Sequence, residues 1–293
     1  MRAQPGYGGQ MLEPPADLDG LVDAWSTSIK DIQQVANSLQ TRQWQLATGC
    51  PGWSVADVVA HIIDAESMIA GDPRTDHEPD WAALPHVTSD FARTTEAGVD
   101  ARRGRSPEEL LGELSEVIAR REHQLDSGPR DLAAEVPAFT AATLPLGRLL
   151  TMRTFDTWVH SQDIRDAIGQ EGGLGSPGAQ VTASLMLAAT PRIWAKVVGA
   201  PVGSVLRLDI LGPGVTTSAI VEVMPDGRAQ MTEPRPGAET ATDAWLRGSW
   251  PAVMHRMAGR PLPSGALGSS PGLELDGDPD LVDRLSSALN IAP

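Results

Sequence analysis

Asp156 and His160 stand four residues apart in a segment whose apolar residues recur at helical spacing. At about 100° per residue, they lie about 40° apart on one face of a helix. Leu149 and Met152 fall close to the same arc, so an acid and a histidine share the face that should turn into the core. Burying an unpaired carboxylate is costly, and a divalent metal ion would satisfy both side chains. The alternative is an ion pair at the surface.

A second histidine, His61, borders the apolar stripe of an earlier predicted helix that starts at Ser54. Such a histidine, taken alone, is more often a hydrogen-bonded core residue than a ligand. Combined with the later pair, it completes a set of two histidines and one carboxylate. The set His61, Asp156 and His160 would hold zinc and leave one coordination position for water or substrate.

Three aspartates lie within one turn of these histidines. Asp57 and Asp64 flank His61, and Asp163 follows His160. Histidines that bind a metal usually donate their other ring N–H to a carboxylate or carbonyl. We therefore expect Asp57 or Asp64 to orient His61, and Asp163 to orient His160.

The chain has one cysteine, Cys50, in a Gly-Cys-Pro-Gly turn. It cannot form an internal disulfide or supply the thiolate cluster of a structural zinc site. A thiol becomes a good nucleophile only beside a group that favours its thiolate, and no histidine is close in sequence. The sequence indicates a small turn residue here and not a catalytic nucleophile.

The 293 residues carry a formal net charge of -15. This charge repels phosphate backbones and anionic membrane surfaces, so we expect no nucleic acid and no membrane as a partner. The first residues have no apolar run typical of a signal peptide, and no window approaches the ~20 apolar residues of a membrane span. A cytoplasmic monomer or small homo-oligomer is therefore expected.

The elements that would position these residues are helices. Residues 1–16 are rich in glycine and proline and are predicted to be disordered, whereas residues 17–169 are predicted to form a four-helix bundle. Four segments have helical apolar spacing, with capping residues or breaks at their ends: residues 17–39, 54–69, 106–125 and 146–169. Residues 71–105 lack any periodicity and are predicted to be a long loop.

The composition changes after residue 169, where a segment rich in glycine, proline and serine follows. Residues 170–293 are predicted to be a linker, a helix and a small α+β domain, which makes the chain multidomain. The expected helices span residues 179–198, 242–257 and the segment after Asp278. The expected strands span residues 204–211, 218–224, 228–232 and 273–275.

Two blocks of sequence resemble the mycothiol-dependent maleylpyruvate isomerase family, which belongs to the DinB-like helical bundles. Residues 50–61 read Cys-Pro-Gly-Trp-Ser-Val-Ala-Asp-Val-Val-Ala-His, and residues 153–165 include Trp-Val-His-Ser-Gln-Asp-Ile-Arg. The two blocks are fairly specific together and weak apart. Residues 244–280 resemble the sterol-carrier-like C-terminal domain of many members.

The resemblance implies a zinc site made by a histidine on the second helix and by an acid and a histidine on the fourth. These roles match His61, Asp156 and His160. The family pattern has glutamate where this chain has Asp156, whose side chain is one methylene shorter. The resemblance also implies a C-terminal arginine that binds an anionic substrate. Arg260 matches it best, and a solvated arginine after a helix is the alternative.

The implied function is that of an enzyme dependent on zinc or another divalent metal ion. Mycothiol, as the thiol cosubstrate, would attack a small electrophilic molecule in an isomerase or S-transferase reaction. A metal that activates water would instead give a hydrolase. The alternative from another class is a non-catalytic binding protein, whose bundle holds metal structurally and whose C-terminal domain carries an apolar ligand.

Overall fold

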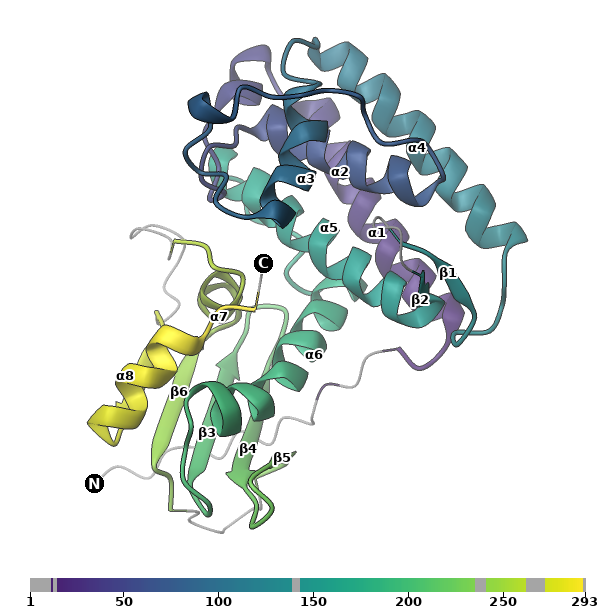
Figure 1. The fold of residues 1–293 in the computed structure, drawn as a ribbon. Coiled ribbons are helices and arrows are strands. Elements are labelled where there is room, and N and C mark those ends of the chain that lie inside the picture. Colours follow the sequence, from purple (N-terminus) through teal and green to yellow (C-terminus); the bar gives the residue numbers. More distant parts are fainter. Residues whose placement is uncertain (1–11, 13–14, 139–142, 235–240, 262–271, 292–293) are drawn as a thin grey trace. The chain divides into compact units, whose positions relative to one another are not determined.

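The computed structural model describes residues 12, 15–138, 143–234, 241–261 and 272–291 (Figure 1). The chain divides into two compact units, Pro15–Gly178 and Ala179–Ala292. The first unit is mainly helical, and the second combines a sheet with helices. The predicted multidomain class, with an α part and an α+β part, is therefore confirmed. The predicted disorder of residues 1–16 falls almost wholly outside the described residues. Among the described helices, none is both long enough and apolar enough to span a membrane.

Four long helices form the framework of the first unit. They are α1 (Leu18–Ser38), α2 (Val55–Ile69), α4 (Pro107–Ser127) and α5 (Leu146–Ile168). Helix α1 packs on α5 and α4, and α2 packs on α4 and α5. Their buried faces carry the predicted periodic residues, which include Trp25, Ile29, Ile62, Leu114 and Leu149. Packing of these amphipathic faces is what stabilises the helices.

The ends of these helices follow the capping signals in the sequence. Ser54 and Asp57 form a capping box at the start of α2, and Ser106 and Glu109 form one at the start of α4. Each box satisfies backbone N–H groups that the first turn leaves unpaired. Helix α5 ends at Gly169, whose φ of 67° suits a residue without a side chain. The N-cap of α2 is therefore fixed at Ser54, seven residues before His61.

The prediction of a loop over residues 71–105 is wrong in its second half. Helix α3 (Asp90–Asp100) forms there and packs on α2. Its buried residues are Glu96, Gly98 and Val99, of which only Val99 carries a large apolar side chain. Gly98 lies against Asp64 so closely that a Cβ atom would come within 2.0 Å of the Asp64 Cγ. A helix that packs through a glycine and a buried acid is invisible to a search for apolar periodicity.

Short elements complete the first unit. They are the 3₁₀ helices η1 (Thr41–Gln45) and η2 (Trp81–Ala83) and the antiparallel pair β1 (Glu135–Pro137) and β2 (Thr143–Pro145). The sequence analysis predicted none of the four, because runs of three to five residues carry too little pattern.

The second unit is built on a five-stranded sheet in the order β5-β4-β3-β6-β7. The strands are β3 (Val205–Leu211), β4 (Thr217–Val223), β5 (Ala229–Thr232), β6 (Ala244–Ser249) and β7 (Glu274–Gly277). Strands β3 and β6 run parallel and the other neighbours antiparallel. The helices of this unit are α6 (Pro177–Arg192), η3 (Ile193–Val197), α7 (Trp250–Met257) and α8 (Pro279–Ala288) (Figure 1). Helix α7 packs on β3 and β6, α8 on β7, and η3 on β4.

The predicted helix over residues 242–257 is wrong in its first half, where β6 pairs with β3. Ala244 and Leu246 are buried and their neighbours less so, which is the period of two expected of a strand. Ser249 then caps α7, and Pro251 stands in its first turn. The Ser-Trp-Pro sequence was the available signal for this boundary. The other predicted helices and strands of this unit are confirmed to within a few residues.

Candidate functional site

Helices α2 and α5 bring His61, Asp156 and His160 together. His61 Nε2 lies 3.2 Å from Asp156 Oδ2, and His160 Nε2 lies 3.7 Å from Asp156 Oδ1. One donor atom from each residue lies within 4.8 Å of the other two. Burial, together with His160 and Arg153, lowers the pKa of His61 more than Asp156 raises it, so His61 is neutral at pH 7. Neutral imidazole is the form that binds a metal ion.

Asp156 has a cationic partner within the fold. Arg153, one turn earlier on α5, donates from Nη1 to Asp156 Oδ2 at 2.9 Å. Burial raises the pKa of Asp156, but Arg153 and then His61 and His160 lower it more, and the pKa lies well below its ordinary value. The carboxylate is therefore charged and paired without a metal.

Glu66 is the centre of a buried network that joins four helices. Its carboxylate accepts from Trp25 Nε1 at 3.1 Å, Arg121 Nε at 3.0 Å and Arg153 Nε at 2.9 Å. Burial raises the pKa of Glu66, but Arg153 and Arg121 outweigh burial and the net pKa is lowered. Through Arg153, Glu66 also holds the Asp156 carboxylate in place. Sequence reasoning missed Glu66, because one glutamate in a helix gives no sign of its burial.

The other edge of the His160 ring faces Asp163 and Cys50. His160 Nδ1 lies 2.8 Å from Asp163 Oδ2, which is the pairing that the sequence predicted. Burial lowers the pKa of His160, but Asp156 and then the hydrogen bond to Asp163 raise it to about 10. The Cys50 thiol donates to Asp163 Oδ2 at 3.2 Å and lies 3.9 Å from His160 Nδ1. Cys50 is therefore part of the site and not merely a turn residue.

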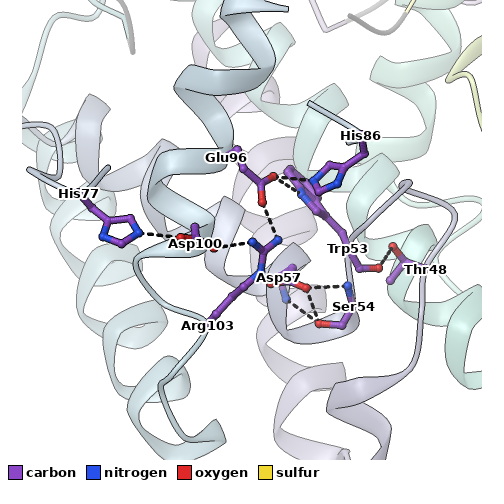
Figure 2. A network of polar contacts seen from close by, with 9 residues as sticks. All are labelled: Thr48, Trp53, Ser54, Asp57, His77, His86, Glu96, Asp100 and Arg103. Atoms are coloured by element: carbon purple, nitrogen blue, oxygen red, sulfur yellow. Dashed lines mark hydrogen bonds and ion pairs between the residues drawn. The ribbon is translucent and has the colours of Figure 1, made fainter. Parts of the chain in front are cut away.

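The predicted pairing of His61 with Asp57 or Asp64 is wrong. Asp57 caps α2 and accepts from Arg103 Nε at 3.1 Å (Figure 2). Asp64 accepts from Arg102 Nη1 at 2.8 Å. Among the described residues, neither carboxylate forms a hydrogen bond with His61. Both aspartates instead bind arginines of the segment after α3, within the range that the sequence predicts to be a loop.

Trp53 packs against both histidines. Its ring centroid lies 5.1 Å from that of His61 and 5.9 Å from that of His160. Figure 2 shows the indole Nε1 donating to Glu96 Oε2, at 2.8 Å, with His86 Nε2 3.1 Å from the same oxygen. Helix α3 thus fixes the aromatic wall of the site. Glu96 and His86 were missed because α3 itself was not predicted.

The donor set fits a divalent metal ion. Two imidazole nitrogens and one carboxylate oxygen are common zinc ligands in catalytic sites, which keep another position open. The Asp156 side chain is 29% exposed, whereas those of His61 and His160 are 12% and 8% exposed. A small molecule could therefore approach such an ion from the Asp156 side.

Arg260 belongs to the second unit, where it follows α7. Its backbone N–H donates to His255 O at 2.8 Å, and its Nη1 donates to Ala258 O at 2.9 Å. These bonds make it part of the turn that ends the helix. Its role in binding an anionic substrate stays a prediction.

The model of the mycothiol maleylpyruvate isomerase N-terminal domain family matches residues 25–165. Two uncharacterized proteins of Mycobacterium tuberculosis, MT0041 (strain CDC 1551 / Oshkosh) and Rv0036c (strain H37Rv), are each 30% identical to this chain over 148 residues. The match covers 47% of this chain and 52% of each relative. The chain thus spans about half the length of the curated relatives that it matches.

Solved structures extend the likeness to the fold of most of the chain. The crystal structure of the mycothiol-dependent maleylpyruvate isomerase is 17% identical, with a TM-score of 0.54 over 88% of this chain and 92% of that one. A histidine-to-alanine mutant of that enzyme is 18% identical, with a TM-score of 0.51 over 87% of this chain and 96% of that one. At this identity the likeness shows a shared fold. Residues 25–165 of this chain are similar to the N-terminal domain of the mycothiol maleylpyruvate isomerase family.

Proposed function

We propose that this protein is a metal-dependent enzyme in which a low-molecular-weight thiol attacks a small electrophilic molecule. The observation that carries the proposal is the convergence of His61, Asp156 and His160 within a domain of this family. Zinc is the proposed metal and mycothiol the proposed thiol. The cytoplasm is the proposed compartment, because its reducing conditions keep a thiol available.

The proposal includes the architecture that the resemblance implies. Residues 17–169 would be a DinB-like four-helix bundle, to which α3 adds a further helix. Residues 170–293 would be a linker and a sterol-carrier-like domain. The packing of α1, α2, α4 and α5 and the five-stranded sheet are the features that support this assignment.

Each residue of the site has a role in this proposal. Zinc, when bound, supplies a Lewis-acidic centre that lowers the pKa of a coordinated thiol. His61 and His160 would hold it through Nε2, and Asp156 through a carboxylate oxygen. Asp163 fixes the ring of His160, and Arg153 fixes the carboxylate of Asp156.

The reaction that follows is addition of a thiolate to an activated double bond. The sulfur electron pair forms a bond to carbon, and the electrons of the double bond move towards the conjugated carbonyl. In an isomerase, rotation about the new single bond and expulsion of the thiolate restore the double bond with the other geometry. In an S-transferase, a proton adds to carbon and the carbon–sulfur bond remains.

Two assays with an activated cis-alkene test the proposal: mycothiol-dependent isomerisation of the alkene, in which the thiol is returned, and consumption of mycothiol, in which the thiol stays bound to carbon. Turnover should be lost on chelation and restored by zinc, while circular dichroism stays unchanged because Arg153 already pairs Asp156. A folded protein that shows no turnover with zinc restored would contradict the proposal. It would favour a binding protein whose second unit carries an apolar ligand.

Arg260→Ala is expected to lower kcat/KM for an acidic substrate. A charge-assisted hydrogen bond from arginine contributes about 1.5–3 kcal/mol, or about ten- to a hundredfold. Metal content should stay constant, because Arg260 is outside the three-ligand set. Arg228→Ala, an exposed arginine of the same unit, is the control. Equal kcat/KM values for both variants would show that Arg260 does not bind the substrate and only stabilises the end of α7.

Cys50→Ser is expected to keep most of the turnover. Cys50 donates to Asp163, and the attacking sulfur should come from the thiol cosubstrate. Serine preserves a donor to the same carboxylate. Steady-state rates at saturating mycothiol provide the measurement. Complete loss of turnover with normal folding and metal content would show that Cys50 is a nucleophile.

A further inference from the structure

We propose that Cys50, His160 and Asp163 form a second metal site, selective for a thiophilic ion, on the edge of the His160 ring that faces away from Asp156. One donor atom from each of the three lies within 4.8 Å of the other two. All three residues are buried. The first set uses Nε2 of His160 and this set uses Nδ1, so the two sites share one imidazole.

The distances among the donor atoms suit a metal ion. Cys50 Sγ lies 3.2 Å from Asp163 Oδ2 and 3.9 Å from His160 Nδ1, and Nδ1 lies 2.8 Å from Oδ2. An ion with bonds of about 2.3 Å to sulfur and about 2.1 Å to nitrogen and oxygen separates its donors by roughly 3.4–3.6 Å at tetrahedral angles. Shifts of a few tenths of an ångström in each side chain would accommodate the ion.

The backbone holds the Cys50 thiol in position before any ion binds. The Cys50 N–H donates to Thr48 Oγ1 at 3.2 Å, and the Trp53 N–H donates to Cys50 O at 3.1 Å. Thr48 Oγ1 in turn donates to Trp53 O at 3.0 Å (Figure 2). Gly52, with φ of 80°, closes the turn in a conformation that favours glycine. Since His160 and Asp163 share one helix, all three donors stand on ordered backbone.

The charges distinguish the two sets. A thiol loses its proton when it binds a metal, so bound Cys50 and Asp163 would carry two negative charges against a divalent cation. In the first set Asp156 carries one negative charge, and Arg153 already lies 2.9 Å from it. Thiolate also favours Cd²⁺, a softer ion than Zn²⁺, more strongly than imidazole and carboxylate do. A thiophilic ion such as Cd²⁺ should therefore prefer the cysteine set.

A pocket gives such an ion access to the thiol. Its volume is about 440 Å³, and its walls include Gln45, Thr48, Cys50, Trp53, Ala60 and Arg103. Loop residues make up most of this lining, which also includes the cationic side chains of Arg102 and Arg105. Cys50 is 7% exposed, which leaves the ligand atom close to the pocket wall.

An ion bound by Cys50, His160 and Asp163 affects metal binding by the first set, because the two sets share His160. An ion on Nδ1 leaves the ring proton of His160 on Nε2, where it points towards Asp156. His160 can then no longer serve the first set, so a thiophilic ion would inhibit the enzyme. This consequence rests on the proposed function, whereas the cysteine site itself does not.

Titration of the purified full chain with Cd²⁺ tests the site. We expect one tightly bound Cd²⁺ with the ultraviolet charge-transfer absorption of a sulfur–cadmium bond. Cys50→Ser should lose this absorption and bind Cd²⁺ at least about a hundredfold more weakly, since even an indirect partner of a metal ligand contributes ten- to a hundredfold. His61→Ala is the matched control, because it removes a ligand of the first set only. It should keep both the absorption and the affinity.

Asp163→Asn supplies a second variant should Cys50→Ser fold poorly, and it should weaken Cd²⁺ binding while the absorption remains. Absence of the sulfur–cadmium absorption in the wild type would overturn the site. Loss of the absorption in His61→Ala would also overturn it, because the ion would then belong to the first set. Mycothiol turnover without the absorption refutes the cysteine site alone. The absorption without turnover refutes the proposed function alone.

Discussion

His160→Ala is expected to lower kcat/KM by more than about a hundredfold, the upper range for losing a residue that only orients a metal ligand. His160 stands at the centre of the site, with Asp156 at one ring nitrogen and Asp163 at the other. Removing the ring takes away a proposed ligand and leaves the Asp163 carboxylate without its imidazole. Steady-state kinetics with added zinc measure the effect, and thermal melting shows whether the variant is folded.

His123→Ala is the matched control for this experiment. His123 is exposed on α4, outside the three-ligand set, so its loss should change kcat/KM by less than about twofold. If His160→Ala keeps kcat/KM within about tenfold of the wild type, loss of one ligand has been tolerated and the proposed role of His160 is wrong.

Glu66→Gln is expected to lower the free energy of unfolding of the first unit by about 3–5 kcal/mol, as for other buried ion pairs that lose one partner. The Glu66 carboxylate is fully buried and neutralises both Arg121 and Arg153. Glutamine keeps the shape but leaves the buried Arg121 without its counter-charge and Arg153 with Asp156 alone. Urea denaturation followed by circular dichroism and tryptophan fluorescence measures the change.

Asp72→Asn is the control for this effect. Asp72 pairs with Arg120, and both side chains are exposed, at 40% and 45%. An exposed ion pair contributes about 1 kcal/mol or less, so this variant should be close to the wild type. Equal destabilisation by Asp72→Asn and Glu66→Gln would show that burial of the Glu66 network does not govern the stability of the unit.

The same network predicts a dependence of stability on pH. The pKa of Glu66 in the folded protein lies below its ordinary value of 4.5, so the folded state binds this proton less tightly than the unfolded state. Its contribution is complete above pH 4.5 and is lost as pH falls through the folded pKa. Glu66→Gln should lack this share of the acid sensitivity.

The sequence predicted the helices that bear the site because their apolar spacing and capping residues agree. Ser54 and Asp57 fix the start of α2, and the apolar residues of α5 place His160 in the core and Asp156 at its edge. Local rules of this kind act within a few residues, so one sequence suffices to apply them. The pairing of His160 with Asp163 follows from the same helical geometry.

The partners from distant elements could not be predicted in this way. Glu66 and Arg153 are 87 residues apart, and Cys50 and His160 are 110 residues apart. Helical spacing does not reveal which side chains of two helices meet. Trp53 belongs to a motif of the sequence, but its hydrogen bond to Glu96 could not be predicted, because Glu96 lies on α3, which was itself not predicted.

The metal content of purified protein tests the central claim most directly. The measurement belongs in the Cys50→Ser background, which removes the proposed thiolate site and leaves the three-ligand set intact. Elemental analysis should find one divalent ion per chain in that protein, and far less than one after His61→Ala or His160→Ala is added. Stoichiometric metal retained in both double variants would contradict the assignment of His61, Asp156 and His160 as the metal site.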